Sequence, residues 1–320
     1  MNIIANRKIF YIISGALMLA SIIAIAVFGL KLGTDFTGGS LLEVEYSGER
    51  PDSQVIHEQL AQFNLGNILV QQTGERGVIL RFKDVGEETH QKILGALRGT
   101  DVLPNEEKTE EFGPLPAMPQ SGNGFKIIEK RFNAIGPVIG NELKRRSVFA
   151  ILLVLGFIVI YIAWSFRRVS KPVSSWKYGI VAIAALIHDV LIPAGIFSLL
   201  GKYGGVEVDA LFVTALLTIL GFSVHDTIVV FDRVRENLHK YKGREFSEFE
   251  MTVEKSVKET VVRSITTSFT VLLSLIVVFF WGGESVKYFS LVLILGVVFG
   301  VYSSIFIASP LLVTWQKWNR

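Results

Sequence analysis

The fourth of six long apolar stretches, Ala210–Phe231, reads ALFVTALLTILGFSVHDTIVVF and carries an aspartate, Asp226, within it. The third, Tyr178–Leu200, reads YGIVAIAALIHDVLIPAGIFSLL and carries Asp189 in the same way. Each stretch has the length of about 20 residues that a helix needs to cross a bilayer. Because a charge at mid-membrane costs at least about 2.5–3.5 kcal/mol on insertion scales, an acid kept there indicates a use. Reversible binding of a proton is a common use, and it points towards transport.

The composition places the chain in a membrane. Of the 320 residues, 50% are hydrophobic and 19% are charged, and the mean hydropathy is +0.45. These values exclude an ordinary soluble domain. Six stretches reach transmembrane length, which predicts an α-helical polytopic membrane protein. They are Ile9–Leu30, Ser147–Phe166, Tyr178–Leu200, Ala210–Phe231, Ser264–Trp281 and Tyr288–Val313.

The spacing of these stretches predicts four parts. Residues 1–30 form a first transmembrane helix, 31–146 an α+β domain outside the membrane, 147–313 a five-helix bundle, and 314–320 a short tail. The first stretch follows two basic residues, as the apolar part of a secretory signal does. It is longer than that part, however, and no small-residue cleavage site follows it, so we expect a retained anchor.

Basic residues near the spans set the expected orientation. The connections after the third and fifth spans carry one lysine each, whereas those after the second and fourth are rich in Lys and Arg. Because basic connections stay in the cytoplasm, both termini are expected there, and residues 31–146 on the external face. The basic residues are Arg167, Arg168, Lys171, Lys177, Arg233, Arg235, Lys240, Lys242, Arg244, Lys255 and Lys258.

The external segment has the pattern of a ferredoxin-like α+β domain, with the order β-α-β-β-α-β. Alternation predicts strands, and apolar residues at helical spacing predict two amphipathic helices. The expected elements are Gly39–Tyr46, Pro51–Asn64, Ile68–Gln72, Val78–Phe82, Glu87–Leu97 and Phe125–Phe132. The stretch rich in Pro, Gly and Glu between the second helix and the last strand is expected to be a mobile excursion.

No enzyme chemistry is predicted for this chain. It has no cysteine, which excludes disulfides, thiolate metal sites and cysteine nucleophiles. His57 and His90 lack metal-ligand spacing and are expected to face solvent from the two helices. We therefore expect no catalytic residue, no metal, no organic cofactor and no nucleic-acid partner, and we interpret the external domain as a binding module.

Three motifs follow one another at span boundaries. DFTGGS, at Asp35–Ser40, follows the first span, and its two glycines suit a sharp exit from helix to strand. The fourth span closes with HDTIVVFDRVREN, and the fifth opens with RSITTSFT. In this order and over the whole chain, the motifs resemble the SecF family, membrane subunits of bacterial protein export that are related to RND-type transporters. The motif positions carried over are Asp35, Phe36, Thr37, Gly38, Gly39, Asp232 and Arg233.

This resemblance implies a function and partners. SecF-like proteins pair with a SecD subunit, here expected as a separate polypeptide, and associate with the SecYEG channel, with YajC or YidC as further partners. They use the proton-motive force to draw unfolded preproteins across the lipid bilayer. The family's essential acid falls on Asp226 and its essential arginine on Arg263. His225 stands where many relatives carry Asn, which adds it to the candidate proton path.

The residues themselves are compatible with a proton relay. Arg263 begins the fifth span from the face at which the fourth span ends, and a positive partner would favour the ionised form of Asp226. Separation of the two side chains would then switch Asp226 between proton release and uptake. The hydroxyls of Thr266, Thr267 and Thr270 are candidates for the same relay. The alternative is a static buried salt bridge between two helices.

The remaining polar residues have open interpretations. Asp189 has either a functional role or a structural hydrogen bond to a neighbouring helix, and His188 is expected to point elsewhere, into packing. Asp232 and Arg235 have the spacing of a surface pair, while Asp232 and Arg233 are also candidates for a gate or partner interface. Leu238–Val262 is expected to be an amphipathic helix on the cytoplasmic membrane face.

Two other functions compete with protein export. An RND-like exporter of lipids or small molecules usually has larger external domains and more spans. An intramembrane aspartyl protease would use Asp189 and Asp226, but such enzymes are expected to show Y-D and G-x-G-D, and this chain has H-D in both spans.

Overall fold

The structure is a computed structural model that describes residues 2–98, 126–166, 173–240 and 246–318. The chain divides into two compact units, which are treated separately. The first combines Met1–Lys31 with Arg145–Arg320 and is called the membrane unit here. The second, Leu32–Lys144, is called the inserted unit.

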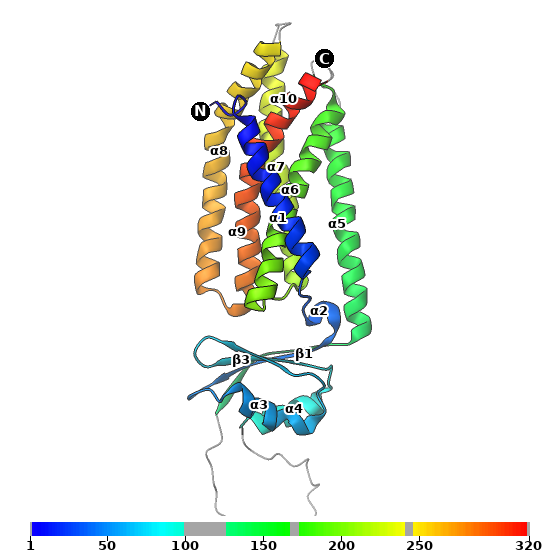
Figure 1. The fold of residues 1–320 in the computed structure, drawn as a ribbon, viewed down its shortest axis with the longest axis vertical. Helices are drawn as coiled ribbons and strands as arrows, with labels where there is room; N and C mark the ends of the chain where they lie inside the picture. Colours follow the sequence, from blue (N-terminus) through cyan, green and yellow to red (C-terminus); the bar gives the residue numbers. More distant parts are fainter. Residues whose placement is uncertain (1, 99–125, 167–172, 241–245, 319–320) are drawn as a thin grey trace, which may run out of the picture. The chain divides into compact units, whose positions relative to one another are not determined.

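The inserted unit has the predicted ferredoxin-like fold. Its strands pair antiparallel in the order β2-β3-β1-β4, and its two main helices follow β1 and β3 (Figure 1). Alternate residues of β1 are buried in the core, as the sequence pattern predicted. The strands are β1 (Gly39–Tyr46), β2 (Leu69–Thr73), β3 (Gly77–Phe82) and β4 (Ile127–Ile135); the helices are α2 (Thr34–Thr37), α3 (Ser53–Leu60), the 3₁₀ turn η1 (Ala61–Phe63) and α4 (Glu87–Arg98). The expected excursion before β4 lies outside the described residues.

His90 corrects one prediction for this unit. Its side chain is only 3% exposed rather than solvent-facing. The ring stacks on Phe132 of β4 with centroids 3.7 Å apart, and Nδ1 lies 3.2 Å from a carboxylate oxygen of Glu87. The flat, partly apolar imidazole thus covers an aromatic ring of the sheet while its polar edge meets a carboxylate. His57 is exposed, as expected.

Tyr46, at the end of β1, gives a test of this core. The side chain is 1% exposed, and burial raises the pKa of Tyr46 to about 12, from about 10 in an unfolded chain. Its contribution to stability is therefore complete below about pH 10 and is lost as the pH rises through about 12. Across this pH window, we expect the free energy of unfolding of the inserted unit to fall by about 2–3 kcal/mol more in the native protein than in the Tyr46→Phe variant. Limited proteolysis of both proteins at pH 9 and 12 measures the difference; equal losses would contradict it.

The membrane unit contains six helical segments long and apolar enough to span a bilayer, which confirms the predicted number among the described residues. Five of these segments are single helices, and among them the first packs on the third, the third on the fourth and the fourth on the fifth (Figure 1). The sixth consists of α9, a π-helical turn η2 and α10. The helices are α1 (Arg7–Phe28), α5 (Pro137–Ser165), α6 (Ser175–Gly204), α7 (Ala210–Lys240), α8 (Phe246–Trp281), α9 (Glu284–Ser303), η2 (Ser304–Ala308) and α10 (Ser309–Trp318).

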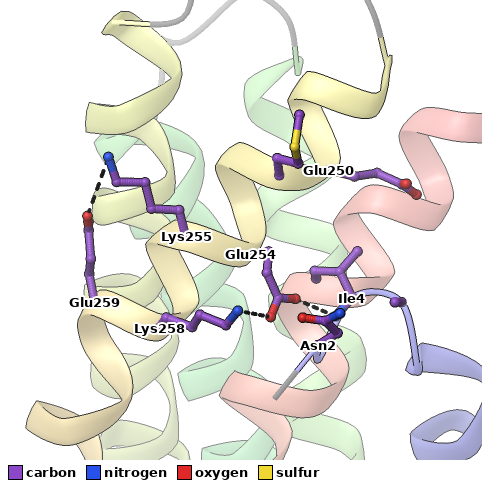
Figure 2. A pocket seen from close by; sticks show the side chains of 9 residues that line it. Asn2, Ile4, Glu250, Glu254, Lys255, Lys258 and Glu259 are labelled. Atoms are coloured by element: carbon purple, nitrogen blue, oxygen red, sulfur yellow. Dashed lines mark hydrogen bonds and ion pairs between the residues drawn. The ribbon is translucent and has the colours of Figure 1, made fainter.

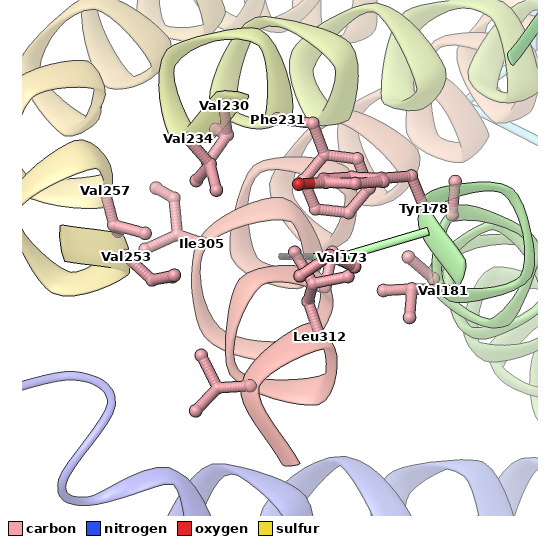
Figure 3. Close-up of a cluster of buried hydrophobic side chains, with 14 of the residues drawn as sticks. Val173, Tyr178, Val181, Val230, Phe231, Val234, Val253, Val257, Ile305 and Leu312 are labelled. Carbon is pink, nitrogen blue, oxygen red and sulfur yellow. The ribbon is translucent and has the colours of Figure 1, made fainter. Parts of the chain in front are cut away.

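The helices of this unit differ sharply in burial. In α6, α7 and the sixth segment about half or more of the apolar window is buried, whereas α1, α5 and α8 are mostly exposed. Figure 3 shows an apolar cluster of this unit, in which Phe231 of α7 packs against Tyr178 of α6, and Leu312 of α10 lies nearby. The two helices that carry the intramembrane acids are therefore the central ones.

The π-helical turn lies just before a proline. Pro310 cannot donate a backbone hydrogen bond, and its ring would clash with the carbonyl four residues earlier in a regular helix. The wider turn Ser304–Ala308 accommodates the proline, so the irregularity of this segment has a local cause.

The expectation of a separate amphipathic surface helix over Leu238–Val262 is wrong. Residues 246–262 are the first part of α8, which continues without a break to Trp281, because no proline or glycine interrupts it. The polar part packs on the chain's first residues instead of lying separately. Glu254 accepts the backbone N–H groups of Ile3 and Ile4, and Arg7 pairs with Glu250 at 2.9 Å (Figure 2 shows the pocket that Glu254 lines).

Candidate functional site

Asp226 lies on the buried side of α7, with 5% of its surface exposed. Its Oδ1 accepts a hydrogen bond of 2.6 Å from the hydroxyl of Ser264 on α8. Its Oδ2 is buried and has no hydrogen-bond partner among the described residues. A buried carboxylate oxygen without a partner carries a large desolvation cost, which protonation removes. The geometry thus leaves one oxygen of Asp226 as a place for a proton.

Asp189 is fully buried on α6 and has partners for both oxygens. Nδ1 of His188 lies 2.9 Å from Oδ1. Oδ2 accepts from Ser223 of α7 and, at 2.7 Å, from Ser303 of α9. The expectation that His188 would point away from Asp189 is therefore wrong: the two adjacent side chains bond each other. Of the two roles proposed for Asp189, the hydrogen bond to neighbouring helices is present.

Hydroxyl groups connect the surroundings of the two acids. Ser223 stands one helical turn before Asp226 on the same face of α7. Thr227, next to Asp226, shares a 2.8 Å hydrogen bond with Ser304 at the start of the π-helical turn. Ser303 and Ser304 are neighbours in the sixth segment. The first bonds Asp189 directly, and the second bonds the residue next to Asp226.

Arg263 is not brought to Asp226. Its side chain is exposed on α8, and no ion pair joins the two among the described residues. Instead the next residue, Ser264, turns inward and bonds Asp226. The static salt bridge considered from the sequence is thus not formed in this structure.

The three threonines of the predicted relay also face outward. Thr266, Thr267 and Thr270 are exposed, and their hydroxyls donate to carbonyls of their own helix at 2.7–3.1 Å. Together with Arg263 they occupy positions i, i+3, i+4 and i+7, which form one stripe along α8; we call these four residues the α8 polar stripe. His225 is exposed as well.

The residues that close the fourth segment form polar links at its end. Asp232 pairs with Arg235 at 3.4 Å, which confirms the surface pair expected from the spacing. Arg233 donates to Glu259 of α8 at 2.6 Å and to Glu236 at 2.5 Å. Arg233 thereby ties the end of α7 to α8.

The DFTGG motif builds a crowded turn in the inserted unit. Asp35, Phe36 and Thr37 lie in α2, and Phe36 is buried. Gly38 has φ +75° and ψ 164°, and a Cβ atom there would meet Cα of Pro137 at 2.6 Å. Gly39 has φ +125°, and a Cβ would meet the carbonyl oxygen of Phe82 at 2.8 Å. Both glycines thus combine a positive φ with a close approach of backbone atoms, which suits the sharp exit expected at this motif.

The sequence interpretation missed the hydroxyl residues around the acids. Four buried serines and one threonine surround Asp189 and Asp226: Ser223, Ser264, Ser303, Ser304 and Thr227. The signal was present in the sequence, because Ser223 precedes Asp226 by one turn and the pair Ser303–Ser304 interrupts an apolar span. Among the described residues, no group of His, Cys, Asp or Glu has an arrangement that could hold a metal ion.

Two features of the described residues define the class of protein: six helical segments of membrane length with acids in the core, and a ferredoxin-like unit inserted after the first of them. This is a polytopic membrane protein with ionisable groups in its interior. The sequence matches the family "Protein export membrane protein SecD/SecF, C-terminal" over residues 119–318 and the "SecD/SecF GG Motif" over residues 23–49. The chain belongs to the SecD/SecF family.

Individual relatives agree with this assignment. The protein translocase subunit SecF of Thermobaculum terrenum is 40% identical over 99% of this chain and 94% of its own length. That of Anaerolinea thermophila is 35% identical over the same shares. Among solved structures, the crystal structure of SecDF from Thermus thermophilus, described as translocon-associated, matches with a TM-score of 0.79 and 27% identity over the whole chain. The present chain spans 39% of the length of that SecDF chain.

Proposed function

We propose that this chain is a SecF-like subunit of the Sec protein translocase, which works with a separate SecD-like subunit and uses the proton-motive force to promote translocation of preproteins. The observation that carries this proposal is Asp226, an acid in the core of a SecD/SecF family member with one buried oxygen lacking a partner among the described residues. A transmembrane potential supplies about 2.3 kcal/mol per charge per 100 mV, so a few protons supply the energy of a large movement. The role is transport and not catalysis.

The proposal includes a location and an orientation. The chain lies in the bacterial cytoplasmic membrane, with both termini in the cytoplasm and the inserted unit on the external face, where it meets unfolded preprotein. The connections that follow the second and fourth membrane-length segments are rich in Lys and Arg, which supports this orientation. The SecYEG channel is the further partner, with YajC or YidC as additional candidates.

The α8 polar stripe supports a SecD-like partner. An arginine exposed on the side of a membrane helix is costly to leave facing lipid. The four residues lie on one flank of α8, beside the face that contacts α7 and α9, and apolar residues such as Ile265 occupy the other flank. A second membrane subunit that packs on the stripe would cover Arg263 and bring it a partner.

We expect Thr270→Trp to weaken this contact. A bulky ring within the stripe keeps the helix apolar but blocks close approach of another helix, since membrane interfaces rely on small residues. Co-purification of the SecD-like subunit from detergent extracts should fall about tenfold, which corresponds to about 1.4 kcal/mol. Ile265→Trp, an equal enlargement on the opposite flank, is the control. Equal SecD recovery with both variants would contradict the assignment of the stripe.

Export in living cells tests the function as a whole. Cells depleted of their own SecF receive this chain together with its cognate SecD, and maturation of a signal-peptide-bearing protein is followed by pulse labelling. We expect maturation to be restored, and a protonophore to remove the restored part. If a stable complex with SecD forms but maturation is not restored, the proposed function is wrong.

A further inference from the structure

We propose that His188 and Asp189 form a second proton-binding site, which we call the His188–Asp189 pair, and that its occupancy is coupled to that of Asp226. This inference rests on the proposed function of Asp226 as a proton carrier. It adds a site on a different helix, with a histidine nitrogen as the atom that takes the proton.

The hydrogen bond between the two side chains fixes where a proton goes. An ionised Asp189 accepts from Nδ1 of His188 only if Nδ1 carries a hydrogen, so a neutral ring has its lone pair on Nε2. This Nε2 is buried and has no hydrogen-bond partner among the described residues. A proton added there yields an imidazolium next to a carboxylate, and the net charge of the pair changes from −1 to 0.

The carboxyl of Asp189 interacts electrostatically with that of Asp226, which itself also interacts with His225. From α9, the ring of Tyr302 lies at a centroid distance of 6.0 Å from that of His188, and its hydroxyl accepts from Ser14 of α1. Beyond Tyr11, α1 contains no ionisable side chain. From α7 the pair is faced by Ser223, one turn from Asp226. In η2 and α10 the only charged residue is Lys317, near the end of the chain.

A purely structural role explains only half of this arrangement. Asp189 joins α6 to α7 and α9 through Ser223 and Ser303, and a cross-link of that kind needs no histidine. It does not account for a buried imidazole whose second nitrogen lacks a partner among the described residues, which is a costly feature in a membrane core. A proton-binding role accounts for both side chains.

Coupling by charge predicts opposite effects of two substitutions. His188→Gln introduces an amide that can still donate a hydrogen bond to Asp189 but cannot take up a proton. The net charge of the pair therefore stays at −1, which favours the protonated form of Asp226. Asp189→Asn removes the negative charge and favours the ionised form of Asp226. We expect the protonation midpoint of Asp226 to rise with the first variant and to fall with the second, by about one pH unit each, the lower end of what a close buried charge causes.

Infrared titration of the whole protein with its SecD-like partner in liposomes measures this midpoint. The C=O stretching band of protonated Asp226 is the one missing from Asp226→Asn, and its intensity is followed from pH 4 to 9 by about half-unit steps. His57→Gln, on the surface of α3, is the control and should leave the midpoint unchanged. Thermal unfolding verifies that each variant is folded, and His188→Asn replaces His188→Gln if the latter is not.

Opposite shifts support the pair as a second site. Unchanged midpoints, shifts in one common direction, or no titrating band that depends on Asp226 would overturn the inference. The outcome is separate from that of the proposed function. If Asp226→Asn stops export while the His188 and Asp189 variants leave the midpoint unchanged, the function stands and only the second site is refuted.

Discussion

Asp226→Asn is expected to reduce proton-driven export to the level of cells that lack the chain. Asparagine has nearly the same shape and still accepts the hydrogen bond from Ser264, so packing is preserved. Its side chain cannot bind or release a proton. At the place of the Asp226 oxygen that lacks a partner among the described residues, asparagine puts either its NH₂ group or its uncharged carbonyl oxygen. The measurement is maturation of a preprotein in depleted cells, with the membrane level of the variant followed in parallel.

Two further variants sharpen this test. Asp226→Glu keeps a titrating group on a longer side chain, and we expect it to retain part of the activity. Glu248→Gln removes an exposed carboxylate at the start of α8 and should leave export unchanged. If Asp226→Asn exported preprotein as well as the native chain does, proton binding by this residue would play no part in export.

Gly38→Ala is expected to disrupt the inserted unit. The backbone at Gly38, with φ +75° and ψ 164°, lies in a region that is essentially open only to glycine and costs of order 1–3 kcal/mol for other residues. The added methyl would also sit 2.6 Å from Cα of Pro137, a backbone atom that cannot move without shifting the start of α5. The total is about 3 kcal/mol or more, a large share of the stability of a small domain.

The same unit offers a matched control. Gly48→Ala adds the same methyl at a position without positive φ and with no atom within 4 Å of the new Cβ. Limited proteolysis of the two variants in detergent should show rapid cleavage within residues 32–144 for Gly38→Ala only. Equal protease resistance of both would mean that the turn relaxes easily and that the motif has another purpose.

Local patterns in the sequence predicted the elements of this protein well. The alternation of Gly39–Tyr46 produced a strand with the same bounds, and the order of strands and helices produced the ferredoxin-like sheet. Each of these depends on periodicity within a few residues. The six membrane segments depend only on length and hydropathy, which are also properties of the local sequence.

The direction of single side chains was predicted poorly. Arg263 and Ser264 are neighbours, and only the packing of α8 on α7 decides that the serine reaches Asp226 and the arginine does not. His90 was expected to face solvent from its helix, but the sheet beneath it supplies the ring of Phe132 and the carboxylate of Glu129. Such contacts join segments that are far apart in the sequence, so local patterns of residues do not predict them.

The π-helical turn Ser304–Ala308 has a consequence for everything after it. An α-helix advances about 100° per residue, so the extra residue of this turn rotates α10 by about that angle relative to an unbroken helix. Leu312 and Val313, which follow the turn, are fully buried in this setting. Deleting one residue from the turn would straighten the segment and swing these side chains out of the core. The irregular turn thus lets the two halves of one segment meet different neighbours: α9 reaches Asp189 through Ser303, and α10 packs into the apolar cluster.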